Sequence, residues 1–386
     1  MEMGRMEQMV IKQMASISAI PQRIIFLWGL ASLFLMGCKK AEQEPNLKEI
    51  NKTVLVYISA NNDLKYSGLK SIDQMESSYL SEYGNLLVYI KTDRYNSYIL
   101  KIKSNKEVGV IASDTIATYS SQNASDPIFM KMVLEDMKEL SPSKNYGLVL
   151  WSHGTSWLPN LDHVSTKSFG YDRGVETTIT DLKDVIPSGL SFILFDACYM
   201  SSVEVVYELK DKTDYIIASN AEVLNTSFPY DEIVPDLFGN IDDMKDLCQK
   251  YFNFYNNKKG IERSCTVSLI STKELDQLAN QSKELIENNP SFKIDRNVQD
   301  FNFLKEIPIE FFDYLSLFEK NFQKTESQKI GEIINKCILY KAATPTFLNI
   351  PIKEFSGLSI SVPIQQKYQA FYKDLLWYKQ ANVNFF

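Results

Sequence analysis

The sequence contains little of what several classes of protein require. Its 386 residues include only two histidines and five cysteines, and no two cysteines form a Cys-X-X-Cys pair. The cysteines are too few and too scattered for a disulfide framework, and nothing suggests a cysteine-bound zinc site. The formal net charge is −7, so a nucleic-acid partner has no electrostatic support. The composition, 45% hydrophobic and 12% aromatic, is that of a globular protein with a substantial core.

The hydrophobic run near the N-terminus is too short to cross a membrane. It follows Arg23 and spans 13 mostly apolar residues, Ile24 to Met36, whereas a transmembrane helix needs about 20. A basic residue followed by such a run is typical of a signal peptide. The run ends in Leu35-Met36-Gly37-Cys38, which resembles a bacterial lipobox. We therefore expect residues 1–37 to be removed and Cys38 to be acylated; an ordinary signal peptide with an incidental cysteine is the alternative.

The rest of the chain reads as a tether followed by an α/β protein. Residues 38–51 are polar and lack periodicity, so we expect them to hold an exported, lipid-anchored protein off the bacterial cell envelope. From residue 52 onward, short apolar runs alternate with helical patterns, which is typical of α/β domains. We expect a core over 52–238 and a C-terminal part over 239–386 packed on it, or one continuous domain, and a monomer. The first strand is predicted to end at Asn61-Asn62-Asp63, which would cap the following helix.

Two further apolar runs end in residues that can do chemistry. The runs and the residues after them are Leu148–Trp151 with Ser152-His153-Gly154, and Phe192–Phe195 with Asp196-Ala197-Cys198. A short continuous apolar run is typical of a strand buried on both faces of a parallel sheet. Because ligands bind at the carboxyl ends of such strands, His153 and Cys198 are predicted to meet at one edge of the sheet.

A cysteine and a histidine in this arrangement can form a nucleophilic site. The thiolate of Cys198 would be favoured by the histidine and by the N-terminus of a helix predicted over Ser201–Leu209. His153 could protonate a leaving amine. The backbone N–H groups of Gly154 and Cys198 are natural donors to an oxyanion.

The remaining histidine and cysteines are weaker candidates. His163 lies in a polar segment and ends no strand, so we interpret it as a solvated loop residue. Cys248, Cys265 and Cys337 fall in helical or apolar patterns and are predicted to be core thiols.

The flanking residues resemble a known family. The two strand ends, with His153 and Cys198 separated by 45 positions, resemble the caspase-like cysteine peptidases. Five stretches resemble the clostripain family in particular: Val54–Leu64, Trp151–Trp157, Phe195–Glu204, Asp214–Ser219 and Gly357–Pro363. The resemblance implies a caspase-like (caspase/haemoglobinase) α/β sandwich, with a mostly parallel central sheet flanked by helices and a C-terminal α/β extension.

The resemblance also implies an activity. Members of the family are cysteine endopeptidases that cleave peptide bonds after Arg or Lys, with no organic cofactor. By this resemblance Cys198 is the nucleophile and His153 the general acid and base. Asp196 matches the aspartate before Ala-Cys and would be the carboxylate of the S1 pocket, where it would select a cationic P1 side chain. Asp196 could instead merely cap the following helix.

The resemblance also raises the questions of proteolytic activation and of a calcium requirement. Family members are often activated by a cut between the histidine and the cysteine; Lys167-Ser168 is our first candidate and Arg173-Gly174 the second. Some relatives need calcium, but no dense loop of carboxylates is visible, so we predict no metal site and calcium stays open. The segment Ala218–Glu222 holds a single, displaced acid, which leaves the preference between Arg and Lys open.

Two other functions remain open. The first is a membrane-anchored binding lipoprotein that kept the fold and lost turnover, against which the intact His153–Cys198 pair argues. The second is the same fold with Asn-directed, legumain-like specificity. Asp196 argues against the second, because a neutral P1 side chain gains little from a carboxylate.

Overall fold

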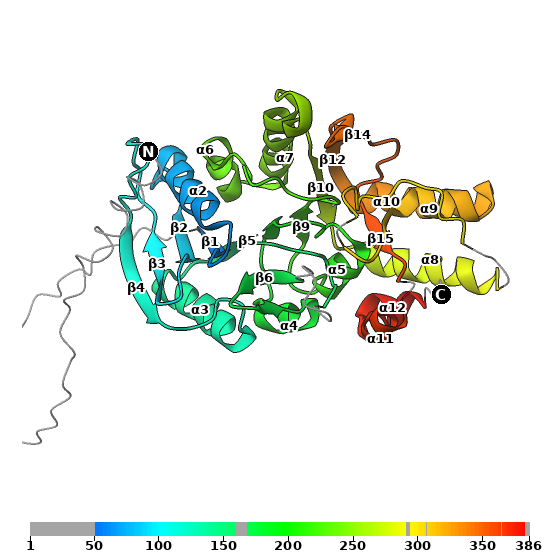
Figure 1. The fold of residues 1–386 in the computed structure, drawn as a ribbon, viewed down its shortest axis with the longest axis horizontal. Helices are drawn as coiled ribbons and strands as arrows, with labels where there is room; N and C mark the ends of the chain where they lie inside the picture. The colour runs from blue at the N-terminus through cyan, green and yellow to red at the C-terminus, as the bar shows by residue number, and fades with distance from the viewer. Residues whose placement is uncertain (1–50, 160–167, 291–293, 306, 364, 383–386) are drawn as a thin grey trace, which may run out of the picture.

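The computed structural model describes residues 51–159, 168–290, 294–305, 307–363 and 365–382. These residues form a nine-stranded sheet with helices on both faces (Figure 1). Cys38, His163 and Lys167 lie outside the described residues. No helix in the described ranges is long and apolar enough to span a membrane.

The sheet is parallel in the middle and antiparallel at both edges. Its strand order is β12-β10-β9-β8-β5-β1-β2-β3-β4. The strands from β9 to β2 run parallel to one another, whereas β10 and β12 at one edge and β3 and β4 at the other pair antiparallel. The strands are β1 (Lys52–Ser59), β2 (Asn85–Lys91), β3 (Asn96–Lys101), β4 (Asp114–Ser120), β5 (Asn145–Trp151), β8 (Phe192–Asp196), β9 (Tyr215–Ala218), β10 (Thr266–Ser271) and β12 (Ile338–Ala343). This sandwich confirms the predicted fold class.

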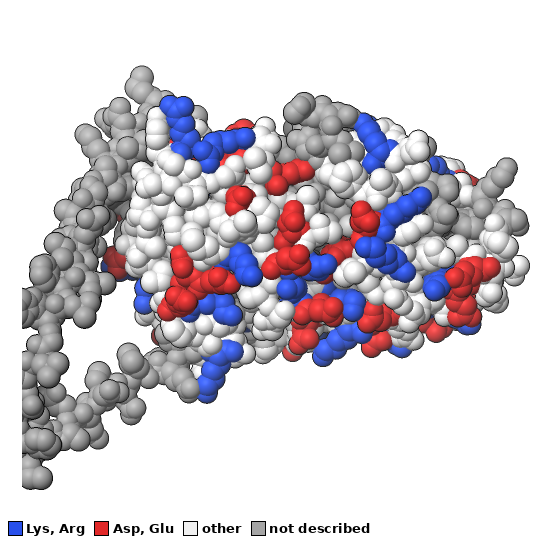
Figure 2. All heavy atoms as spheres, turned by 90° about the horizontal axis from the view of Figure 1, so that it is seen from below, with Lys and Arg blue, Asp and Glu red and all other residues white. Residues whose placement is uncertain are grey.

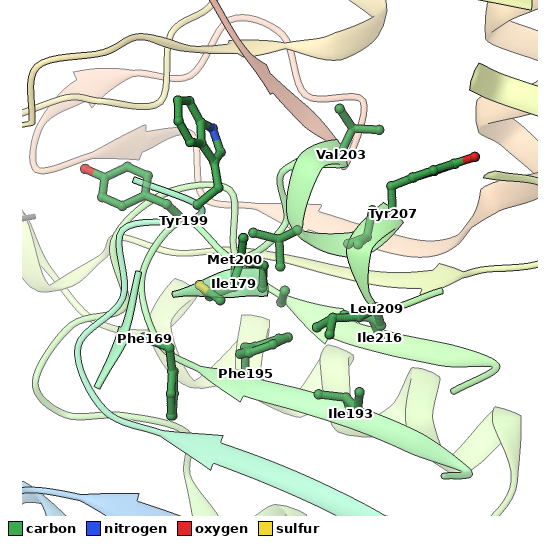
Figure 3. Close-up of a cluster of buried hydrophobic side chains, with 14 of the residues drawn as sticks. Phe169, Ile179, Ile193, Phe195, Tyr199, Met200, Val203, Tyr207, Leu209 and Ile216 are labelled. Carbon is green, nitrogen blue, oxygen red and sulfur yellow. The ribbon is translucent and has the colours of Figure 1, made fainter. Parts of the chain in front are cut away.

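The central strands are apolar on both faces because each face is covered by helices. Along β8, Ile193 and Phe195 enter one core and Phe192 and Leu194 the other, as the two-residue period of a strand requires. Figure 3 shows Ile193 and Phe195 on the side of the sheet that also carries Met200. The helices on that side include α3 (Pro127–Leu140), α4 (Ile179–Val185) and α5 (Val203–Glu208); α2 (Lys65–Ser78), α6 (Tyr230–Ile233), the 3₁₀ helix η1 (Val234–Phe238) and α7 (Ile241–Asn256) cover the other.

The C-terminal part adds two strands to this sheet, β10 and β12, and packs against α5. Its other elements are η2 (Gly260–Glu262), α8 (Leu275–Glu287), β11 (Phe311–Asp313), α9 (Tyr314–Asn321), α10 (Lys324–Cys337), β13 (Thr346–Phe347), β14 (Ile350–Pro351), β15 (Ser359–Ser361), α11 (Gln366–Asp374) and α12 (Leu376–Ala381). Glu204 of α5 is fully buried and accepts hydrogen bonds from Ser361 N (2.8 Å) and the Tyr372 hydroxyl (3.1 Å). Burial raises the pKa of Glu204 to about 7.

Two strands of the nine-stranded sheet carry no clear signal in the sequence, and one helix begins later than predicted. Strands β4 and β12 lie at the two edges of the sheet and are only partly buried, so they lack the continuous apolar run of the central strands. The helix predicted from Ser201 begins at Val203.

On the face seen in Figure 2, acidic and basic side chains are interspersed rather than gathered by sign.

Candidate active site

The predicted pair of residues lies where three parallel strands end. Strand β5 pairs with β1 on one side and β8 on the other, and Trp151 is in register with Asp196. His153 follows β5, Cys198 follows β8, and both line one pocket together with Asp196. From β1, the next strand of the chain, β2, is added on one side of the sheet, whereas β5 and then β8 are added on the other side. The strand order therefore reverses between β1 and β5, and the pocket lies beside this point. Open α/β sheets bind ligands at such points.

Cys198 lies in a turn between β8 and α5. The first residue of α5 is Val203 and its N-cap is Ser202, whose hydroxyl accepts from Val205 N. Cys198 precedes the first residue of α5 by five positions, so stabilisation of its thiolate by this helix stays a prediction. Two backbone groups of one residue contact the sulfur: Val223 N lies 3.2 Å from Cys198 Sγ and donates to it, and the thiol donates to Val223 O at 3.8 Å. A donor at this position favours the negatively charged sulfur.

Tyr199, which follows the cysteine, fixes the conformation of this turn through its backbone and its side chain. Tyr199 has a φ of 62°, in the left-handed region, and its ring stacks on Phe311 with centroids 5.1 Å apart. Its hydroxyl donates to the carboxylate of Glu222. Burial and this carboxylate raise the pKa of Tyr199, so the hydroxyl keeps its proton. Glu222, the displaced acid of the sequence analysis, is thus bound to Tyr199 and is not among the residues that line the pocket.

Gly154 brings the chain after β5 close to the cysteine. Gly154 lies opposite Phe169 in an isolated antiparallel bridge. The hydrogen bonds of this bridge are formed by the adjacent residues: Thr155 N donates to Ser168 O (3.4 Å), and Gly170 N donates to His153 O (3.0 Å). The N–H of Gly154 therefore has no hydrogen-bond partner in the described ranges. A Cβ at this position would lie 2.9 Å from the Cys198 carbonyl oxygen, so the approach requires glycine.

His153 contacts the carboxylate of Asp63, which was predicted to cap the following helix and does not. Its Nε2 lies 2.8 Å from Asp63 Oδ1, and Asp63 lies between β1 and α2. The available clue was that Asn61-Asn62-Asp63 ends a buried strand, as His153 does, and neighbouring parallel strands end at the same edge. The imidazole is 24% exposed and Asp63 72% exposed.

Asp196 lines the pocket, and its two carboxylate oxygens lie in different surroundings. Oδ2 accepts hydrogen bonds from the hydroxyls of Ser227 and Tyr230 (2.9 Å for Tyr230) and, at 3.4 Å, from Phe228 N. Ser227 is itself held by Trp151 Nε1 at 2.8 Å. No hydrogen bond from the described residues ends on Oδ1.

Burial and hydrogen bonds act in opposite directions on the ionisation of Asp196. Desolvation raises the pKa of Asp196 to about 6, and the hydrogen bonds to Oδ2 oppose this rise. Among the described residues that line the pocket, it is the only carboxylate. The helix-capping alternative is wrong, because Ser202 caps α5.

The remaining candidates lie away from the pocket. Arg173 and Gly174 form the exposed tip of the hairpin β6 (Phe169–Asp172) and β7 (Val175–Thr177), with φ of 52° and 82°. The three other described cysteines are buried, as predicted, and burial raises the pKa of Cys265 and Cys337 to about 12. Within the described ranges, no three His, Cys, Asp or Glu side chains gather as metal ligands.

The sequence matches a family of peptidases. A model of the clostripain family matches residues 56–385. Clostripain of Hathewaya histolytica is 25% identical over 238 residues, which cover 50% of this chain and 44% of that protein. This chain therefore spans less than half the length of that curated relative.

Solved structures of bacterial C11 proteases share the fold. The secreted C11 cysteine protease "iotapain" of Bacteroides thetaiotaomicron superposes with a TM-score of 0.75 at 26% identity, over 86% of this chain and 99% of that one. An inactive zymogen C11 protease of Parabacteroides distasonis superposes with a TM-score of 0.73 at 29% identity, over 86% and 98%. The strand order, the pocket and these matches agree: the chain belongs to the clostripain family of cysteine peptidases.

Proposed function

We propose that this cysteine peptidase cleaves peptide bonds on the carboxyl side of Arg or Lys, with Cys198 as nucleophile and His153 as general acid and base. The observation that carries the specificity is Asp196, the carboxylate that shares a pocket with both residues. Its Oδ2 is held by three donors while Oδ1 takes none from the described chain. A guanidinium or ammonium group entering the pocket would form a charge-assisted hydrogen bond with Oδ1.

The first half of the reaction forms a thioester. The thiol proton of Cys198 passes to His153, and the sulfur attacks the carbonyl carbon after the P1 residue. The N–H groups of Gly154 and Cys198 donate to the oxyanion that develops. His153 then gives its proton to the amide nitrogen as the C–N bond breaks, and the amine product leaves.

The second half releases the acid product. A water molecule loses a proton to His153 and attacks the thioester carbon, again with the oxyanion held by the two N–H groups. The C–S bond breaks, Cys198 recovers the sulfur electrons and the proton of His153, and a peptide ending in Arg or Lys departs. Asp196 takes no part in bond making; it holds the substrate in register with the sulfur.

We also propose that the chain is activated by a cut between His153 and Cys198, after Lys167 or Arg173. The exposed hairpin tip at Arg173 favours the second position, since exposed loop tips are preferred sites of proteolysis. N-terminal sequencing of the matured fragment should begin at Ser168 or Gly174. A fragment beginning elsewhere in the interval would reject both positions.

Attachment to the cell envelope is a separate proposal that rests on the lipobox-like Leu35-Met36-Gly37-Cys38. One similar protease is described as secreted, which is compatible with export. Metabolic labelling with a fatty acid should mark the wild-type chain and not Cys38→Ser.

The test of the activity is a matched set of fluorogenic peptides with Arg, Lys, Asn or Leu at P1. Wild-type chain should hydrolyse the Arg or Lys peptides, and Cys198→Ala should hydrolyse none. Turnover after Asn would overturn the role of Asp196 and support the legumain-like alternative. No turnover with any peptide, even after a nick between His153 and Cys198 and with calcium added, would favour the binding lipoprotein.

A further inference from the structure

We propose that Asp63 is a positioning residue for catalysis, which orients the imidazole of His153 and stabilises its protonated form. The inference rests on the proposed Cys198–His153 pair and adds a third group to it. A base oriented by a carboxylate is a common arrangement around activated nucleophiles.

The contact between Asp63 and His153 determines which nitrogen of the imidazole accepts a proton. Asp63 Oδ1 lies 2.8 Å from His153 Nε2. An ionised carboxylate only accepts hydrogen bonds, so Nε2 must carry the hydrogen in this contact. In the neutral imidazole the proton-accepting nitrogen is then Nδ1. Nδ1 is therefore the atom that takes the thiol proton of Cys198 and returns it to the leaving amine.

Capping of α2 does not account for Asp63. The N-cap of α2 is Leu64, and no side chain caps this helix end. The neighbouring Asn62 accepts from Leu64 N through its Oδ1 (2.9 Å) and so takes the local turn-forming role. The carboxylate of Asp63 is directed instead at His153.

The loop that carries Asp63 is held in place by hydrogen bonds to strand β6. Asn61 Nδ2 donates to Asp172 Oδ1 (2.6 Å), and Asn62 Nδ2 donates to Tyr171 O (2.9 Å). Asp172 is fully buried and pairs with the fully buried Lys91 at 3.5 Å. These contacts tie the loop after β1 to the β6–β7 hairpin, so a carboxylate that is 72% exposed can still be held at one place. Rigid support of this kind is what a positioning residue requires.

The exposure of Asp63 limits the size of the effect and makes it testable. An exposed ion pair is weaker than a buried one because water screens it. Replacement of an exposed loop side chain also leaves the core intact. We therefore expect Asp63→Ala to lower kcat about threefold to fivefold and to change KM by less than about twofold.

The experiment compares Asp63→Ala and Asp63→Asn with Asp211→Asn in the full chain. Asp211 is 79% exposed and precedes β9, at the end of the sheet opposite the pocket, so its variant should match wild type. Asp63→Asn keeps an acceptor for Nε2 and loses the charge, so its kcat should fall between those of wild type and Asp63→Ala. An unchanged kcat in both Asp63 variants, or a change confined to KM, overturns the proposal.

A second readout separates this proposal from the proposed function. The rate at which iodoacetamide alkylates Cys198, followed by mass spectrometry of its peptide, reports the Cys198–His153 pair without any peptide turnover. A slower alkylation in Asp63→Ala supports the positioning role even if no peptide is cleaved. Equal alkylation rates in wild type, Asp63→Ala and Asp211→Asn refute it even if Arg peptides are cleaved.

Discussion

The charge on Asp196 should set the acid limit of cleavage after Arg or Lys, and one buried hydroxyl should move that limit. Tyr230 donates to Asp196 Oδ2 at 2.9 Å, and both side chains are buried. The change Tyr230→Phe removes the donor and keeps the ring. Because the donor favours the ionised carboxylate, its loss raises the pKa of Asp196 and lowers the ionised fraction at mildly acidic pH.

The size of the shift follows from the strength of one such bond. A hydrogen bond to a charged group contributes about 1.5 kcal/mol at the lower end of the usual range. Since a factor of ten in an ionisation constant corresponds to about 1.4 kcal/mol, the acid limit should rise by about one pH unit. For wild type, that limit is expected near the pKa of about 6 that burial gives Asp196. Near pH 8.5 the two proteins should cleave at similar rates.

The assay is kcat/KM for an Arg peptide between pH 5 and 9. Tyr251→Phe is the matched control, because it removes a buried hydroxyl that has no hydrogen-bond partner among the described residues and should leave the profile unchanged. The pH profile of Cys198 alkylation by iodoacetamide, which has no cationic group, should not shift in Tyr230→Phe. Superimposable acid limits for wild type and a folded Tyr230→Phe would refute the reasoning. A parallel shift in alkylation would assign the limit to the Cys198–His153 pair instead.

Two further predictions concern the approach of Gly154 and the buried carboxyl of α5. Gly154→Ala places a Cβ 2.9 Å from the Cys198 carbonyl oxygen. The backbone must shift, which displaces the Gly154 N–H from the oxyanion and should lower kcat about 100-fold. A kcat within threefold of wild type would contradict this. Glu204 has a folded-state pKa of about 7, above its ordinary value of 4.5, so the stability that its protonated form contributes is lost as pH rises through about 7. The melting temperature of wild type should therefore fall between pH 5 and 8, and Glu204→Gln should show a smaller fall; equal falls would contradict the assignment.

The edge of the sheet at which His153 and Cys198 lie could be predicted because the pattern that defines it is local. Strands β5 and β8 are buried over their last five residues, and a polar residue stands at the end of each run, Ser152 after β5 and Asp196 as the last residue of β8. A continuous apolar run indicates a strand covered on both faces, and parallel strands deliver their carboxyl ends to one edge. No knowledge of the pairing partner was needed for this inference.

Of the partners of the site residues, only Asp63 has a clue in the sequence, because the partners come from distant parts of the chain. Asp196 is held by Ser227 and Tyr230, which are 31 and 34 positions away, and His153 meets Asp63 at a separation of 90. The donor to Cys198 Sγ is a backbone group, Val223 N, and backbone groups carry no sequence signature. Only the order of the strands brings these segments together.

The position of Cys198 also depends on the C-terminal part of the chain. The turn that carries it continues into Ser201, whose hydroxyl donates to Gly357 O at 2.8 Å, and into Ser202, which bridges to Ser359. Because these groups are buried, breaking the contacts would leave unpaired polar atoms beside the nucleophile. Strand β10 meanwhile covers the edge of β9, so the sheet is continuous from the core into the C-terminal part. The geometry of the nucleophile is therefore a property of both parts of the chain, and the match to the family likewise covers both parts, over residues 56–385.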